Sequence, residues 1–341
     1  MATVKSADLV TDLSSSPDVT QAYYEKKLLT RAKYRNLHAR FAASSDMPSK
    51  SGKTVIMRRY AHLALALSPL SEGVAPAGKT PTLDDFQATV NQHGDFIALS
   101  DYAQWTMKDA ILQHWTMLLG EQEGMTIDSV DRDTAIAGTN VIRSNGTDRT
   151  DVLEIVDFND LDRAIRVLAN EGAEKHLGGN SGNDSQNSFP TMAAYAAITV
   201  PDVIFDLQNI TGPNGFRWAS EYKGASEGEI GRYKQIAFFE APDPSGLGAG
   251  GKKYAGGGAT SALVKNTAGT ADVYTILIFG KNGFTKVPLN GHSSSFISKP
   301  LGSAGSADPL DQIATIGWKT IGARLITNQD WLCRIECAAS L

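Results

Sequence analysis

Apolar residues that recur every three to four positions predict helices in four parts of this chain, over residues 16–42, 106–137, 158–170 and 202–207. Pro17 and Pro201 suit the first turns of the first and last of these helices. Asp157 or Asn159 can cap the third. The helices are separated by long stretches of other character, so a purely helical bundle is not expected.

The longest predicted helix has one apolar face, formed by Ile111, Trp115, Leu118 and Met125. Gly120 and Gly124 weaken this helix by roughly 1 kcal/mol each, which a helix held by other elements tolerates. The helix over residues 16–42 is different, because its apolar stripe is intermittent and its polar face is strongly basic. It has little to bury itself against locally, and we expect it to dock on another surface.

Four segments are typical of strands, because they are apolar runs or are rich in β-branched and aromatic residues: 195–200, 233–240, 273–279 and 284–289. Asn282-Gly283 predicts a tight turn between the last two, and Asn145-Gly146 predicts another tight turn. The glycine-rich residues 223–231 and 242–258 are expected to be loops.

The last segment of the chain alternates, with Trp331, Cys333, Ile335 and Cys337 at every second position. This alternation predicts a strand buried on one face. At about 3.3 Å per residue the two cysteines lie roughly 13 Å apart, too far for a disulfide, so both are expected to be buried and reduced. The order of helices and strands lacks a regular βα alternation, and the predicted fold class is α+β.

Residues 53–101 have the composition of a long two-stranded excursion. Residues 54–57 and 61–67 are extended or apolar, residues 68–81 contain many glycines and prolines, and residues 86–99 return with strand-like composition. A two-stranded ribbon is marginally stable in water. The ribbon therefore needs a partner surface.

Composition is that of an ordinary globular protein, with 42% apolar and 20% charged residues, and a chain of 36.4 kDa is expected to form two or three compact units. No window approaches eighteen consecutive apolar residues, and the first residues lack an apolar signal core. Neither membrane insertion nor secretion is indicated.

Charge is distributed unevenly, although the formal net charge is only −5. Ten basic residues and two acidic ones lie between Glu25 and Arg59. A basic head before an acidic body can indicate contact with nucleic acid. In a self-assembling protein it can equally place the head of one copy on the acidic body of another, and this second interpretation is favoured.

Residues Gly73–Thr80 match the phosphate-binding pattern G-x-x-x-x-G-K-[ST]. A working loop of this kind must lead directly into a helix. Pro81 disfavours a helix at that point, and Pro76 removes a donor from the loop itself. A turn is the favoured interpretation, and a nucleotide-binding enzyme that uses Gly73–Thr80 is the alternative.

No other motif assigns a catalytic, cofactor-binding or metal-binding residue. Gly224–Gly228 matches G-x-S-x-G but lacks the flanking strand and helix of a nucleophile elbow. The six histidines are scattered, without metal-ligand spacing. The carboxylate pairs Asp84-Asp85 and Asp131/Asp133 lie in polar segments and are interpreted as solvated, without raised pKa values.

Several short motifs occur in an order that resembles the major capsid proteins of tailed bacteriophages, the Hong Kong 97-type fold, and within them the coliphage N4-like family. These motifs are Gly52–Val55 with Arg58, Ser68–Gly73 with Pro76, His93–Asp95, Ser100-Asp101, Asp131–Asp133 before Ala137–Thr139, Gly228–Gly231, Val273–Gly280, and Asp308–Leu310 with Gly317–Lys319. The likeness spans nearly the whole chain.

The resemblance implies five segments: an amino-terminal arm (1–51), an extended E-loop (52–100), a peripheral domain with a long spine helix (101–147), an axial domain (148–312), and a carboxyl-terminal strand that returns to the peripheral domain (313–341). Because the sequence starts at Met1, we also expect that no amino-terminal scaffold segment has been removed. The basic arm, the unsupported ribbon and the acidic body then become complementary surfaces of neighbouring copies.

The expected function is that of a noncatalytic shell protein that forms the hexamers and pentamers of an icosahedral phage head around double-stranded DNA. It would be located in the virion after assembly in the bacterial cytoplasm, with itself as partner, with portal, scaffolding or decoration proteins as further partners, and in weak contact with the DNA. No cofactor and no membrane are expected. A third possibility is a nucleic-acid-binding protein that uses residues 21–60.

Overall fold

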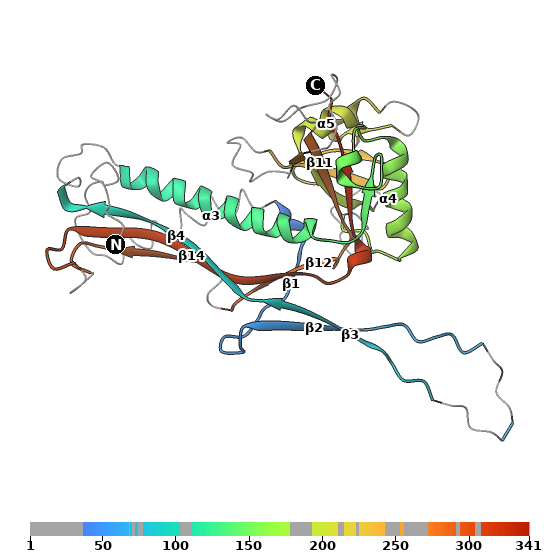
Figure 1. Cartoon of the computed structure of the whole chain (residues 1–341), viewed down its shortest axis with the longest axis horizontal. Coiled ribbons are helices and arrows are strands. Elements are labelled where there is room, and N and C mark those ends of the chain that lie inside the picture. Colours follow the sequence, from blue (N-terminus) through green and yellow to red (C-terminus); the bar gives the residue numbers. More distant parts are fainter. Residues whose placement is uncertain are drawn as a thin grey trace.

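The computed structural model describes residues 37–67, 69, 72–73, 78–102, 111–177, 193–210, 215–222, 225–242, 253–255, 272–290, 294–303 and 308–340. Figure 1 shows three parts: a five-stranded sheet with one long helix along it, an eight-stranded sheet with two shorter helices, and a two-stranded ribbon that extends away from both. The mixture of helices and strands without a regular βα alternation confirms the predicted α+β class.

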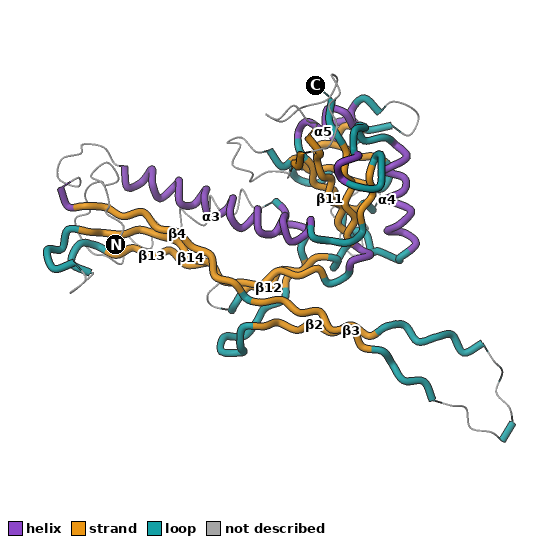
Figure 2. The backbone as a smooth tube through the Cα atoms, in the orientation of Figure 1, coloured by secondary structure: helices purple, strands orange, loops and turns teal. Residues whose placement is uncertain are grey.

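The five-stranded sheet is organised around one long strand, β14 (Ile313–Ile326). All of β4 (Asn91–Ser100) pairs antiparallel with one side of β14, along residues 313–322. β13 (Ser294–Lys299) and β12 (Phe284–Pro288) together follow the other side. The two-residue strand β1 (Ala43–Ser44) joins β12 in parallel. The helix α3 (Ile111–Ile136) runs along β4, β14 and β13 of this sheet (Figure 2).

The helix α3 (Ile111–Ile136) confirms the long helix predicted at residues 106–137, of which 106–110 lie outside the described residues. Near its start it packs through Trp115 and Leu119 against Phe296 and Trp318 of the sheet. The predicted apolar face is wrong at Leu118, which is 55% exposed, because the helix turns Leu119 to the sheet instead.

The eight-stranded sheet has the order β5-β15-β11-β6-β9-β8-β7, with β10 paired to β11. Its strands are β5 (Val141–Arg143), β6 (Tyr195–Thr199), β7 (Arg217–Trp218), β8 (Glu229–Tyr233), β9 (Ile236–Glu240), β10 (Lys253–Ala255), β11 (Asp272–Phe279) and β15 (Leu332–Cys337). Every residue of the central strand β11 is buried, including Asp272 and Thr275, and its mostly apolar sequence predicts this burial.

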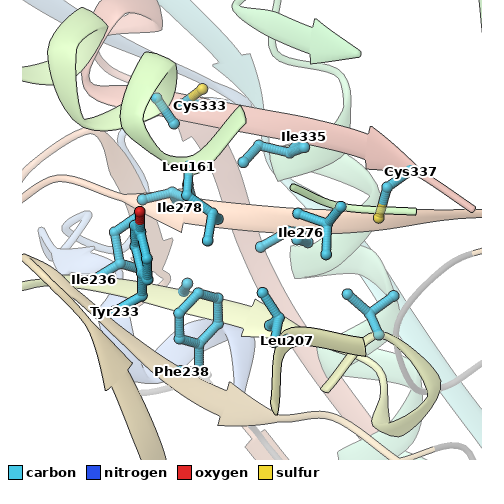
Figure 3. Packing of buried hydrophobic residues seen from close by; sticks show 14 of the residues in the cluster. Leu161, Leu207, Tyr233, Ile236, Phe238, Ile276, Ile278, Cys333, Ile335 and Cys337 are labelled. Atoms are coloured by element: carbon cyan, nitrogen blue, oxygen red, sulfur yellow. The ribbon is translucent and has the colours of Figure 1, made fainter. Parts of the chain in front are cut away.

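Helices cover both faces of this sheet. On one face, α4 (Phe158–Asn170) and α5 (Pro201–Gln208) contribute Leu161 and Leu207 to a core with Ile276, Ile278 and Ile335 (Figure 3). On the opposite face, Phe41 from the short 3₁₀ helix η2 (His38–Phe41) and Ile136 from the end of α3 form a second core. Asp157 caps α4, and Pro201 starts α5, as predicted.

The last strand differs from its prediction. All six residues of β15 are buried, because the strand lies inside the sheet between β11 and β5. Cys333, Ile335 and Cys337 belong to the core under α4 and α5. On the other face Glu336 is fully buried and accepts hydrogen bonds from Arg143 and Arg149. The face of β15 that carries Glu336 is therefore buried through ion pairs, although its polar residues predict a face exposed to water.

The two-stranded ribbon consists of β2 (Thr54–Tyr60) and β3 (Leu83–Thr89). The prediction is confirmed for these strands and is wrong for residues 91–100. After Val90 the chain continues as β4 and pairs with β14 instead of β2. One extended stretch of backbone thus belongs first to the ribbon and then to the five-stranded sheet (Figure 1).

Four further local predictions need correction. The helix predicted over residues 16–42 falls outside the described residues up to position 36, and beyond it only η2 is helical before the chain becomes extended at Ala42. The predicted loop 223–231 contains the start of β8, and the predicted strand 233–240 is broken by a turn at Lys234 (φ +47°). The predicted loop 242–258 contains β10. β14 was not predicted from local sequence patterns, although it lies in the segment 313–341, for which the resemblance implies a carboxyl-terminal strand.

Three 3₁₀ turns complete the described elements: η3 (Arg149–Asp151), η4 (Ala219–Glu221) and η6 (Gln329–Trp331). Asn282 (φ +62°) and Gly146 (φ +73°) confirm the two predicted tight turns. No helix in the described part of the chain combines the length and apolarity needed to cross a membrane.

Candidate interaction surfaces

Beyond its paired strands the ribbon continues as two extended arms whose apolar side chains have no cover. The last backbone hydrogen bond described between the arms at this end of the ladder runs from the Ala61 N–H to the Thr82 carbonyl and is 3.0 Å long. Leu63, Leu65 and Leu67 follow at every second position and are 56%, 78% and 84% exposed. In an extended chain such residues lie on one side. The arm therefore presents a continuous apolar edge to its surroundings.

Lys79 lies in the opposite arm and does not form part of a phosphate site. Its ammonium group donates to the carbonyl of Ala64 and, at 3.1 Å, to that of Leu65. The next element after Thr80 is the strand β3, where a phosphate-binding loop requires a helix. The alternative of a nucleotide-binding enzyme is therefore not supported, and Lys79 serves to tie the two arms together.

The paired part of the ribbon is held by cross-strand charges. Arg58 donates to Asp85 at 3.1 Å, and Arg59 lies 3.6 Å from Asp84 and 5.2 Å from the centre of the Phe86 ring. These exposed pairs contribute little stability individually. They match Asp84 and Asp85 to specific partners, so the two carboxylates are more than solvated surface groups.

The ribbon is anchored at its base to the five-stranded sheet. Val55 and Phe86 pack beside Val287 and Leu325 of that sheet, with Met47 from the chain segment before the ribbon. The buried base fixes the direction in which the arms leave the body. Only the outer part of the ribbon is without support.

A second uncovered surface lies on the face of the five-stranded sheet that points away from α3. Gly317 of β14 pairs with Phe96 of β4 on one side and with Ile297 of β13 on the other, so the three residues share one face. Phe96 is 64% exposed and Ile297 is 38% exposed. A Cβ on Gly317 would lie 2.7 Å from the Cβ of Phe96, so the glycine leaves room for the aromatic side chain.

The segment that precedes β1 connects the two sheets. The backbone N–H of His38 donates to Asp128 of α3, and Nδ1 of its ring lies 2.7 Å from the same carboxylate. Arg40 donates at 2.5 Å to the carbonyl of Glu227, in the turn that precedes β8 of the eight-stranded sheet. The root of the amino-terminal segment thus holds the long helix and the second sheet together.

Asp131 is buried, in contrast to the prediction that this residue is solvated. It faces β14, where Arg324 donates to it at 2.6 Å. Burial raises the pKa of Asp131, and the guanidinium group of Arg324 partly opposes that rise. Its neighbour Asp133 is exposed, and pairs with Arg132 at 3.0 Å. Only one member of this predicted pair is therefore a surface group.

The G-x-S-x-G match does not form a nucleophile elbow. Residues 223–224 lie outside the described residues, and Ser226 uses its backbone N–H to donate to Glu229, the first residue of β8. Tyr222 and Arg232 also donate to Glu229. Burial alone would raise the pKa of this carboxyl, but the bonds from Arg232, Tyr222 and Ser226 outweigh it and lower the pKa. The motif belongs to a buried structural network.

The histidines and cysteines take separate places in the structure. His62 is exposed, His93 lies on β4, and the rings of His176 and Phe41 form an edge-to-face contact; the side chains of His114 and His292 lie outside the description. No group of three potential metal ligands occurs among the described residues. Cys333 and Cys337 are buried free thiols, as predicted.

Sequence reasoning missed two of these features. The row through Gly317 was not found, because local sequence patterns predicted neither a strand at this position nor its pairing with residues 91–100 and 294–299. The charged network around Glu336 was not found, because polar residues on an alternating strand are usually assigned to a solvated face. A glycine between β-branched and aromatic residues in Ile316-Gly317-Trp318 is the one local signal for close approach of a neighbouring side chain.

Comparison with known proteins places the fold. No family model matches the sequence, and no curated protein matches it. Among solved structures, the chain is similar to three phage capsids or heads. The TM-score is 0.57 for the capsid of Ralstonia phage GP4, 0.55 for the cyanophage Pam1 capsid and 0.55 for the head of Helicobacter pylori bacteriophage KHP40.

These likenesses cover almost the whole of each chain. The GP4 capsid is 9% identical over 88% of both chains, the Pam1 capsid is 12% identical over 90% of this chain and 93% of that one, and the KHP40 head is 12% identical over 87% of both. The fold is therefore that of phage capsid chains, and it fits the Hong Kong 97-like architecture that the sequence resemblance implies.

Proposed function

We propose that this chain is a structural major capsid protein, a noncatalytic subunit that assembles into the hexamers and pentamers of an icosahedral phage head enclosing double-stranded DNA. The observation that carries the proposal is the similarity of the fold to phage capsid chains, which extends over almost the full length of this chain and of each chain compared. It agrees with an independent property of the single chain, which exposes apolar surfaces that a lone molecule leaves in water.

Two exposed apolar surfaces support assembly, one on the ribbon arm over residues 61–67 and one on the five-stranded sheet. Leu63, Leu65 and Leu67 form an extended apolar edge, and Phe96 with Ile297 forms an apolar row on a sheet. Monomeric proteins rarely leave contiguous apolar surface uncovered. We propose that the arm of one copy covers the sheet of a neighbour, which buries both surfaces in one contact that repeats around a ring.

We also propose the segment names that the resemblance implies. The proposed segments are the amino-terminal arm (1–51), the extended loop (52–100), the peripheral domain with α3 as spine helix (101–147), the axial domain (148–312) and the returning segment (313–341). The amino-terminal arm is distinct from the extended arms of the ribbon. α3 lies along the five-stranded sheet, which supports the peripheral assignment. Within the returning segment β14 joins that sheet, whereas β15 joins the eight-stranded sheet, so this segment serves both domains.

The finer assignments are part of the same proposal. They comprise membership of the coliphage N4-like group, a place in the virion shell after assembly in the host cytoplasm, further contacts with portal, scaffolding or decoration proteins, and a weak contact with the packaged DNA. The charge asymmetry of the sequence supports copy-to-copy contact, because the basic head and the acidic remainder have opposite signs.

Assembly can be tested with leucine variants of the arm. The triple substitution Leu63→Ser, Leu65→Ser and Leu67→Ser removes the apolar edge without touching any buried residue. Leu310→Ser is the matched control, because Leu310 is 75% exposed but belongs to neither proposed surface. Purified proteins are compared by sedimentation velocity and negative-stain microscopy.

Wild-type protein and the Leu310→Ser control are expected to form capsomers, sheets or shells, whereas the triple variant stays as dispersed subunits with unchanged circular dichroism. Shells from the triple variant that match wild type would refute the role of the arm. A wild-type protein that remains a compact monomer at high concentration would refute the proposed function itself.

A further inference from the structure

A buried row of acidic side chains lies between α3 and the five-stranded sheet. Glu123 and Asp131 contact Ser294 and Arg324 of the sheet, whereas Asp128 faces His38 of η2 beside it. The three carboxylates are 1%, 1% and 4% exposed, respectively. Carboxylates are rarely buried without a partner cation. The interface is apolar around Trp115 and Leu119 but becomes acidic along the second half of the helix.

Two of the three acids have charged or basic partners. Asp131 accepts from Arg324 of β14 at 2.6 Å, and Asp128 accepts from His38 of η2 at 2.7 Å. Lys286 of β12 stands directly opposite Arg324 in the sheet. These contacts account for the carboxylates nearest the carboxyl end of α3.

Glu123 lacks such compensation. Its Oε1 accepts from the hydroxyl of Ser294 on β13 at 2.5 Å, and its Oε2 is buried with no hydrogen-bond partner in the described part of the chain. Burial raises the pKa of Glu123, and the bond from Ser294 only partly opposes that rise. A buried carboxyl with one neutral donor therefore favours its protonated form more than a solvated carboxyl does.

The remaining titratable groups at this interface belong to β4. His93 pairs with Thr320, which in turn pairs with Ser294, so His93 lies in the same row as the Glu123 contact. Burial and, next, Arg324 lower the pKa of His93, which favours the neutral imidazole. Asp95 accepts from Gln122 at 2.6 Å on the exposed side of the helix. No element at this contact therefore supplies Glu123 with a direct cation among the described residues.

We propose that the helix seat, the contact of α3 with the five-stranded sheet around Glu123 and Ser294, depends on protonation. In this proposal α3 packs firmly on the sheet when the Glu123 carboxyl is protonated and less firmly when that carboxyl is ionised. A carboxyl whose folded-state pKa is raised contributes its stability below the ordinary value of 4.5. That contribution is lost as the pH rises through the raised value.

The position of the helix seat links it to the packing of both sheets. The far end of α3 carries Ala135 and Ile136 into the core of the eight-stranded sheet, and Arg334 of that sheet donates to the Ile136 carbonyl. The helix thus bridges the two sheets. A loosened seat near Glu123 frees the connection through which one sheet is positioned against the other.

The test is Glu123→Gln in the full-length protein, which keeps an oxygen for the Ser294 hydroxyl but cannot ionise. Melting temperature is measured from pH 4 to pH 8, together with hydrogen exchange of the α3 amides. We expect the variant to match wild type near pH 4 and to melt about 2–4 °C higher at pH 8. Exchange of the amides around position 123 is expected to be about tenfold slower than in wild type at pH 8.

Two further variants test whether the effect of Glu123→Gln comes from the lost charge or from altered side-chain packing. Glu154→Gln alters an exposed glutamate away from the seat, and its melting difference should be near zero at every pH. Ser294→Ala removes the one donor to Glu123, and its destabilisation should grow as the pH rises. A Glu123→Gln difference that is the same at pH 4 and pH 8, or a lower melting temperature at pH 8, would overturn the proposal.

Discussion

Asp128 holds His38 at two points, because one carboxylate oxygen accepts the backbone N–H and the other lies 2.7 Å from the ring nitrogen Nδ1. His38 is 1% exposed, and ninety positions separate the two residues along the chain. The contact joins the root of the amino-terminal segment to the long helix. Both partners are buried, so neither can be replaced by water without rearrangement.

Asp128→Ala should destabilise the fold by about 2–4 kcal/mol, because it leaves the His38 N–H and ring nitrogen buried without an acceptor. Urea denaturation followed by tryptophan fluorescence measures the loss. Asp46→Ala is the control from the same chain segment, since Asp46 is exposed, and its effect should stay within about 0.5 kcal/mol. Equal effects of the two substitutions would contradict the importance of the His38 contact.

Gly317→Ala should destabilise the five-stranded sheet by about 1–3 kcal/mol, because the new Cβ would lie 2.7 Å from the Asp95 carbonyl oxygen and 2.7 Å from the Cβ of Phe96. Gly78→Ala provides the comparison, since a Cβ there meets nothing within 4 Å. Thermal melts of both variants check the prediction. A Gly317 variant as stable as the Gly78 variant would mean that the strands separate easily at this point.

Glu229→Gln should make the protein less stable at neutral pH and flatten its response to acid. The lowered pKa of Glu229 means that its ionised form contributes stability above the ordinary value of 4.5, and that this contribution is lost as the pH falls through the lowered value. Denaturation midpoints between pH 3 and pH 7 measure the effect. Glu227→Gln, an exposed neighbour, should keep the wild-type pH profile.

The two thiols should be inert in the native protein. Burial raises the pKa of Cys333 to about 12, and burial also raises the pKa of Cys337, so neither forms the reactive thiolate near pH 8. A disulfide exchange reagent such as Ellman's reagent should label no cysteine before denaturation and both after it. Rapid labelling of the folded protein would show that the eight-stranded sheet opens at β15.

The sequence predicts elements well where local chemistry is decisive. Asp157 and Pro201 mark the starts of α4 and α5, and the unbroken apolar run at Val273–Phe279 identifies the most buried strand. In each case a cap, a fixed φ angle or uniform apolarity acts within a few residues. Such signals need no knowledge of distant partners.

The features that were missed depend on long-range pairing. β14 mixes threonine, glycine, lysine and apolar residues, and it becomes a strand because β4, some 220 positions earlier, pairs with it. Asp131 looks solvated in the sequence, but Arg324 reaches it from that same strand. Spacing along the chain cannot reveal a cation that arrives from nearly two hundred residues away.

The continuity of β3 into β4 has a mechanical consequence. Residues 83–100 form extended backbone with only Val90 between the two strands, a stretch of roughly 60 Å at about 3.3 Å per residue. Tension applied at the outer end of the ribbon is carried by covalent bonds, with no flexible joint, into the strand beneath the long helix. A pull on the protruding ribbon is therefore transmitted along β4 to β14, with which β4 pairs.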